Sequence, residues 1–185
     1  MKNTLKKQLA ERDPAVLVAL LTDLAMFDPC AEITAGLLLA ESSEIYNHFL
    51  IRLEVMTCGE RYHRLSFDTD ERMCCELRSL LLGIRYCTSG SRQKLEMLLK
   101  ICKAQPFFME HSYDDGYGIE CFYRDELSAM LMEQAVLCDN ATKIWLATEL
   151  ARLVHGDEYG LMKEMVMPVV SAMPELFSHE VISCR

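Results

Sequence analysis

Apolar residues recur three or four positions apart through almost the whole of this 185-residue chain, as on one face of an α-helix. Leu, Met, Ala and Glu are common, and all four favour helices. Short breaks containing Gly, Pro, Ser or Asp separate the periodic segments. The pattern predicts an all-α fold, a multi-helix bundle of antiparallel helical hairpins in which residues 1–185 form a single domain.

Two Asp-Pro dipeptides, Asp13-Pro14 and Asp28-Pro29, each indicate the start of a helix. Asp accepts hydrogen bonds from the first backbone amides of a helix, and Pro suits its first position. We expect helices over 14–26 and 29–40. The first of them carries Val16, Leu17, Leu20, Leu21 and Leu24 at helical spacing.

Later helices are expected between similar breaks. Their predicted ranges are 42–57, 68–87, 91–103, 125–138, 141–155, 158–167 and 169–173. Pro168 is expected to divide the last two, because proline cannot donate the backbone hydrogen bond of a helix interior. Most connectors are short, which favours antiparallel neighbours.

Two segments, LAERDPAVLVALLTDLAMF (9–27) and LATELARLVHGDEYGLMKEMVMPVV (146–170), resemble the helical hairpins of HEAT repeats. Together they span under a third of the chain, and no consensus repeats at a fixed period. The resemblance implies a short HEAT-like α-superhelix as the alternative to a bundle. It implies no particular function.

The main interruption is an aromatic and acidic stretch, QPFFMEHSYDDGYGIECFY, at 105–123. We interpret it as a loop that either packs on the domain, with a minor β-hairpin near 111–122, or contacts a partner. Aromatic side chains are enriched at the centres of protein interfaces, and loops of this length inside compact domains are usually functional. The predicted partner-binding residues are Phe107, Phe108, Tyr113, Asp114, Asp115 and Tyr117.

The net charge of −9 disfavours binding to nucleic acid and favours a protein partner with a basic patch. No run of about 18 uncharged apolar residues suggests a membrane span. Nine cysteines without a CxxC or zinc-finger spacing are typical of free thiols in a reducing compartment, so we expect a cytoplasmic protein.

These features favour a small acidic protein–protein interaction module, such as an adaptor, chaperone, inhibitor or immunity-type protein. Neither a phosphate-binding glycine loop nor a metal-binding motif is present, so no cofactor and no metal are expected. The alternatives are an enzyme that uses His111 or a cysteine thiol, and a structural subunit or homodimer. A subunit would expose a contiguous apolar patch, expected on the Met- and Leu-rich helices after residue 125.

Overall fold

The computed structural model describes residues 10–58, 67–112, 116–157 and 160–172. Within these ranges the fold is all-α, with no strand, as the sequence predicts. The N-terminal helices are α2 (Pro14–Phe27), α3 (Pro29–Leu39) and α4 (Ile45–Met56), followed by α5 (Phe67–Tyr86) and α6 (Ser91–Lys103). The remaining helices are α7 (Gln105–Glu110), α8 (Tyr117–Cys121), the π-helix η2 (Phe122–Leu127), α9 (Ser128–Val136), α10 (Asn140–His155) and α11 (Leu161–Ala172).

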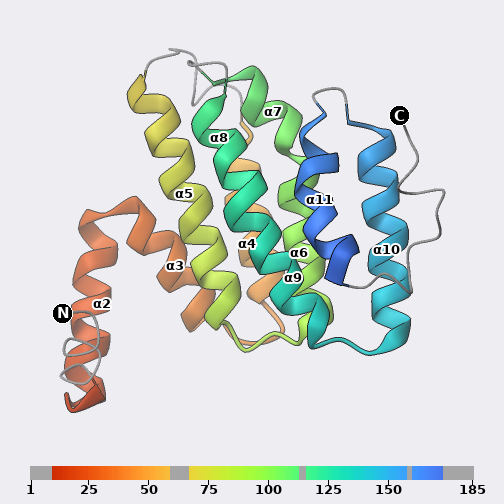
Figure 1. Cartoon of the computed structure of the whole chain (residues 1–185). Helices are drawn as coiled ribbons and strands as arrows, with labels where there is room; N and C mark the ends of the chain where they lie inside the picture. Colours follow the sequence, from red (N-terminus) through yellow and green to blue (C-terminus); the bar gives the residue numbers. More distant parts are fainter. Residues whose placement is uncertain (1–9, 59–66, 113–115, 158–159, 173–185) are drawn as a thin grey trace.

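The helices form a bundle with an arm at one edge (Figure 1). The rod formed by α8, η2 and α9 lies between α5 and α11, with α4 and α6 behind and α10 at the far edge. The buried side chains of the described helices from α3 to α11 form one continuous cluster. That single core fits the expected bundle, in which all helices share a core, better than a row of stacked repeats.

Both Asp-Pro dipeptides cap helices as predicted. The Asp13 carboxylate accepts a hydrogen bond from the amide of Ala15 at 2.9 Å, and Asp28 accepts one from Cys30 at 2.9 Å. A one-residue connection at Asp28 therefore joins α2 to α3 at a sharp angle. This connection sets the direction in which α2 leaves the bundle.

The packing of α3 on α5 holds the arm to the bundle. A Cβ atom placed on Gly83 of α5 would lie 2.5 Å from Cδ1 and 2.9 Å from Cβ of Leu37. The two helices approach this closely because Gly83 has no side chain. Thr34 adds a buried hydrogen bond from its hydroxyl to the carbonyl of Ser79, at 3.2 Å.

One expectation about the helices is wrong. Pro168 does not divide the last helix, since α11 continues through it, with Met165, Val166, Val169 and Val170 buried on either side of it along the helix. Burial of this face stabilises the helix despite the lost hydrogen bond.

Two parts of the bundle that are not consecutive in the chain lie side by side and run parallel. Arg78 pairs with Glu126, and Arg85 pairs with Glu133. Residue numbers therefore increase in the same direction along both helices. The helix α5 therefore runs parallel to the rod of α8, η2 and α9. In the chain, α6 follows α5 and runs in the opposite direction (Figure 1).

Candidate functional site

The stretch 105–123 is largely helical rather than a loop, which corrects the sequence-based expectation. Gln105–Glu110 forms α7, and Tyr117–Cys121 begins the rod. The expected β-hairpin near 111–122 is therefore absent from the described part of this stretch. Phe108, Phe122 and Tyr123 are fully buried, and their burial favours helices that bring adjacent aromatic rings into the core.

The three predicted partner-binding residues that the structure describes differ in their exposure to solvent. Phe108 lies in the core, so its assignment to partner contact is wrong. Phe107 is half-buried and stacks on the ring of His111 with centroids 4.1 Å apart. Tyr117 is 66% exposed at the start of α8, whereas Tyr113, Asp114 and Asp115 lie outside the described residues.

The environment of Tyr117 is polar. Its phenol pKa is raised above the ordinary value, chiefly by hydrogen bonding with Cys121. One guanidinium nitrogen of Arg124 lies 3.5 Å from the sulfur of Cys121, and another donates to Glu120 at 3.0 Å. These contacts join the first turns of the rod, while the Tyr117 ring is exposed to solvent.

Among the described helices, α2 carries the most exposed large apolar side chains. None of its fourteen residues is buried, and its large exposed side chains are between 49% and 86% accessible to solvent. These residues are Val16, Val18, Leu20, Leu24, Met26 and Phe27. Within one chain, Val16, Leu20 and Leu24 therefore do not belong to the core.

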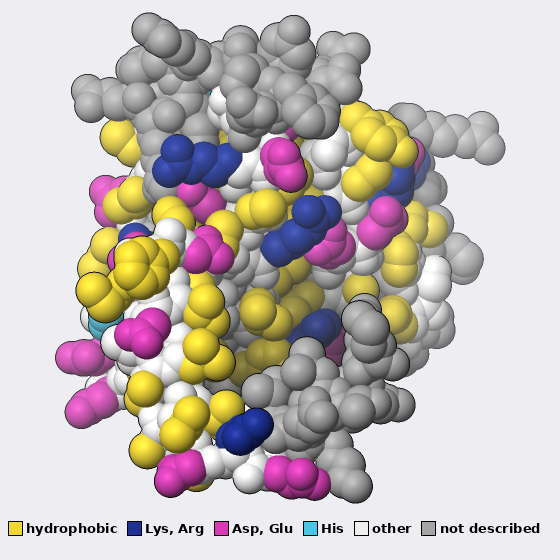
Figure 2. Space-filling view, turned by 90° about the vertical axis from the view of Figure 1, so that its left-hand side faces the viewer, with side chains coloured by type: hydrophobic (Ala, Val, Ile, Leu, Met, Phe, Trp, Pro, Cys, Tyr) yellow, Lys and Arg dark blue, Asp and Glu magenta, His cyan; other side chains and the backbone are white. Residues whose placement is uncertain are grey.

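The two sides of α2 differ in their surroundings. Leu17, Leu21 and Ala25 are half-buried and repeat every four residues, which places them on the side that faces α3. Val16, Leu20, Leu24 and Phe27 follow at the same kind of spacing on an adjacent, exposed side, and we call them the α2 stripe. Figure 2 looks onto this edge of the molecule and shows hydrophobic side chains at the surface beside a hollow.

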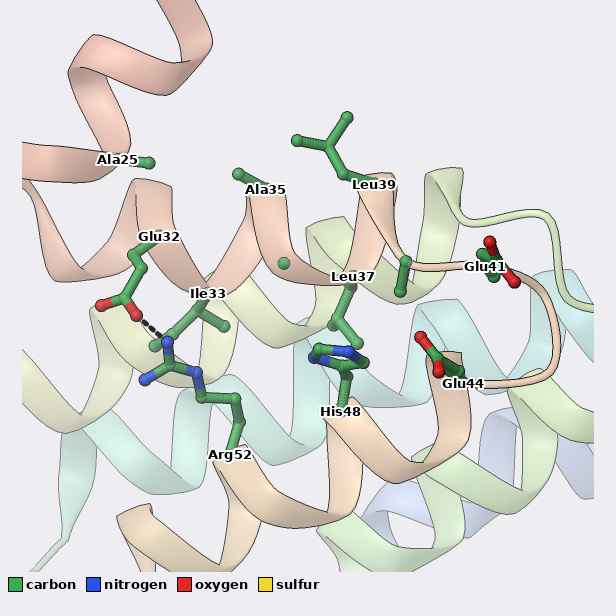
Figure 3. A pocket seen from close by; sticks show the side chains of 12 residues that line it. Ala25, Glu32, Ile33, Ala35, Leu37, Leu39, Glu41, Glu44, His48 and Arg52 are labelled. Atoms are coloured by element: carbon green, nitrogen blue, oxygen red, sulfur yellow. Dashed lines mark hydrogen bonds and ion pairs between the residues drawn. The ribbon is translucent and has the colours of Figure 1, made fainter.

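A groove of about 480 Å³ begins where α2 ends (Figure 3). Ala25 borders it from α2, while Ile33, Ala35 and Leu37 line it from α3. His48 and Arg52 project into it from α4. The groove therefore extends the apolar surface of the arm onto the bundle.

The polar groups at the groove are mainly acidic. Glu32 forms an ion pair with Arg52, which crosses the groove between α3 and α4 (Figure 3). Glu41 and Glu44 are exposed on the connection between these helices and take part in none of the ion pairs of the described chain. The groove thus combines an apolar lining with an acidic end, which suits an apolar segment that carries a basic side chain.

A smaller apolar group lies after residue 125, where the sequence analysis placed a subunit interface. Val136 and Leu137 at the end of α9 and Ile144 on α10 are exposed. Met130, Met162 and Met165, in contrast, are buried in the core. Most of this Met-rich region therefore fills the interior, and the α2 stripe is the more extended surface.

The enzyme alternative would use His111 or a cysteine thiol, and Cys74 and Cys102 are among the buried thiols. Burial raises the pKa of the Cys74 thiol to about 11 and that of Cys102 to about 12, which keeps both protonated at neutral pH. The Nδ1 atom of His111 lies 2.8 Å from the carbonyl oxygen of Phe107. The described side chains also contain no group of three His, Cys, Asp or Glu residues that could hold a metal ion.

Comparison with protein-family models, curated proteins and solved structures found no match to this chain. Among the described helices, none has the length and hydrophobicity needed to cross a membrane. Sequence reasoning missed α2 as a surface because its periodicity was used only to predict a helix. The available signal was composition, since Thr22 and Asp23 are the only polar side chains in a fourteen-residue helix.

Proposed function

We propose that this protein is a protein–protein interaction module whose docking surface is the α2 stripe together with the groove beside it. The observation that carries the proposal is that α2 is apolar around almost its whole circumference and buries no residue. A helix of that composition is normally covered on all sides. Large exposed apolar patches on proteins mark sites of association.

The energetics favour association through this surface. Fully burying a large apolar side chain contributes about 1.5–3 kcal/mol. Each of the four residues of the stripe is about half exposed or more, so covering all four contributes about 3–6 kcal/mol. An isolated helix of about 14 residues is marginal in water. A partner that covers α2 would therefore also stabilise the helix.

The groove constrains the chemistry of the partner. Its apolar lining suits leucine-like side chains, and the free carboxylates of Glu41 and Glu44 suit a lysine or arginine. This fits the expectation, drawn from the net charge of −9, of a protein partner with a basic patch. Adaptor, chaperone, inhibitor and immunity-type roles all use such a surface, and each remains consistent with the proposal.

We also propose that the module works in the cytoplasm. The eight cysteines within the described ranges are free thiols, and three of them are buried. Free cysteines in this number are typical of a reducing compartment. The observation supports the compartment inferred from the sequence.

Affinity capture from a lysate of the native host tests the proposal. The double variant Leu20→Glu, Leu24→Glu should lose every stoichiometric partner that the wild type captures. Ile144→Glu is the matched control, because Ile144 is 57% exposed on a helix far along the chain, and it should capture normally. Equal capture by the wild type and the α2 variant would contradict the proposal.

A further inference from the structure

We infer that the partner of the α2 stripe is a second copy of this chain, with the two α2 helices packed antiparallel about a twofold axis near Leu20. The inference rests on the proposed function and names its partner. Three features support it: the symmetry of the stripe, the charge of the sequence before and after its centre, and the position of the groove.

The stripe is centred on Leu20. Val16 and Leu24 lie one turn before it and one turn after it, at nearly equal exposure. In an antiparallel pair each Val16 contacts the Leu24 of the other copy, and the two Leu20 side chains meet on the axis. A surface that contacts itself in this way is what a twofold interface requires, and residues four apart form the ridges used in the commonest helix packing.

The sequence segments before and after the centre of α2 differ in charge. Residues 1–13 contain four basic side chains, including Arg12, and two acidic ones. Residues 23–44 contain five acidic side chains and no basic one. Antiparallel packing brings Arg12 of one copy to Asp28 of the other, whereas parallel packing would bring like charges together.

The groove lies where the other copy would reach it. Fourteen helical residues span about 21 Å, so the start of one α2 lies beside the end of the other. Ala25, near that end, borders the groove. The groove therefore lies within reach of the start of the other α2 helix.

Sedimentation equilibrium of the full chain tests the inference. The wild type should show a concentration-dependent dimer, and Leu20→Glu, which places two carboxylates on the axis, should be a monomer at the same concentrations. Val18→Glu is the matched control, because Val18 is 52% exposed against 50% for Leu20 but points to the opposite side of α2. It should remain dimeric, and circular dichroism should show the same helix content for all three proteins.

Arg12→Glu tests the antiparallel direction. It should weaken the dimer about 2- to 10-fold at low salt, and the difference from wild type should shrink as salt rises. An unchanged or tighter dimer would overturn the antiparallel arrangement.

Other outcomes separate the inference from the proposed function. A wild type that stays monomeric at several hundred micromolar overturns the inference, and a dimer that survives Leu20→Glu overturns it as well. A monomeric wild type could still capture another protein that the α2 double variant does not capture. In that case the docking surface is correct and only the identity of its partner is wrong. If neither association depends on α2, both proposals fail.

Discussion

The hydroxyl of Tyr123 donates a hydrogen bond of 2.8 Å to the carbonyl oxygen of Ile101, and both residues are fully buried. Ile101 lies in the last turn of α6, where carbonyl groups lack a partner further along the helix. Tyr123 lies in the π-helix η2, next to the equally buried Phe122. The bond therefore joins the end of α6 to the rod at the centre of the bundle.

Replacing Tyr123 with Phe should lower the free energy of unfolding by about 1 kcal/mol. The loss is limited because the amide of Ala104 also donates to the carbonyl of Ile101, at 3.1 Å. Urea unfolding of the two proteins gives the difference. Tyr86→Phe is the control, since the exposed Tyr86 side chain should tolerate the same change without effect. If Tyr123→Phe and Tyr86→Phe lowered the free energy of unfolding equally, the buried hydrogen bond would not be the cause.

Alanine substitutions at two glycines should change the free energy of unfolding in opposite directions. Gly83→Ala should lower the free energy of unfolding by about 1–3 kcal/mol, because the new Cβ would overlap Leu37 and separate α3 from α5. Gly36→Ala should raise it by about 0.5–1 kcal/mol, since nothing lies within 4 Å of the new atom and alanine favours the helix. Thermal unfolding of both variants measures the contrast. A destabilised Gly36→Ala would contradict the structure at α3.

The buried Cys102 thiol should make the fold sensitive to alkaline pH. Its pKa is raised to about 12 in the folded chain, whereas the thiol of an unfolded chain titrates near 9.0. The unfolded state therefore loses this proton first, and stability falls as the pH rises from about 9 towards 12, by up to about 1.4 kcal/mol per pH unit. Below pH 9 the contribution is fully present.

Unfolding of wild type and Cys102→Ala between pH 8 and 11 isolates that contribution. The variant is expected to be less stable at pH 8, because it leaves a small cavity, but to lose less stability as the pH rises. Parallel curves for the two proteins would show that Cys102 does not titrate in this way.

The aromatic and acidic stretch can be tested separately from α2. On the present account, the triple variant Tyr113→Ala, Asp114→Ala, Asp115→Ala and the single variant Tyr117→Ala should fold and still capture the partner. The reason is that the surface proposed for docking lies on α2 and the groove. Affinity capture with these variants beside the α2 double variant gives the comparison. If only the variants in 105–123 failed to capture the partner, this stretch and not α2 would be the binding site.

Much of the fold could be predicted from sequence because local signals at helix ends agreed with the tertiary structure. Asp13 and Asp28 cap the helices that they were expected to start, and α6 spans Ser91–Lys103 as predicted. Cys74 is buried beside a more exposed Cys75, as adjacent positions on a helix require.

The failures occurred where burial outweighed local preference. Phe108 and Tyr123 stand among residues typical of a loop, yet burying their rings favours helices on both sides of 113–115. Pro168 lies on the exposed side of α11, where its ring does not disturb the core. For α2 the periodicity correctly predicted a helix. Periodicity does not indicate whether an apolar side of a helix packs against the same chain or against another one.

Hydrogen exchange in α2 at two protein concentrations tests the central claim most directly. If a second copy covers α2, amides of residues 14–27 should exchange at least about tenfold more slowly at several hundred micromolar than at low micromolar concentration. Amides of α10, whose packing lies within one chain, should exchange equally at both. Exchange in 14–27 that is the same at both concentrations would contradict the claim that a second copy covers α2.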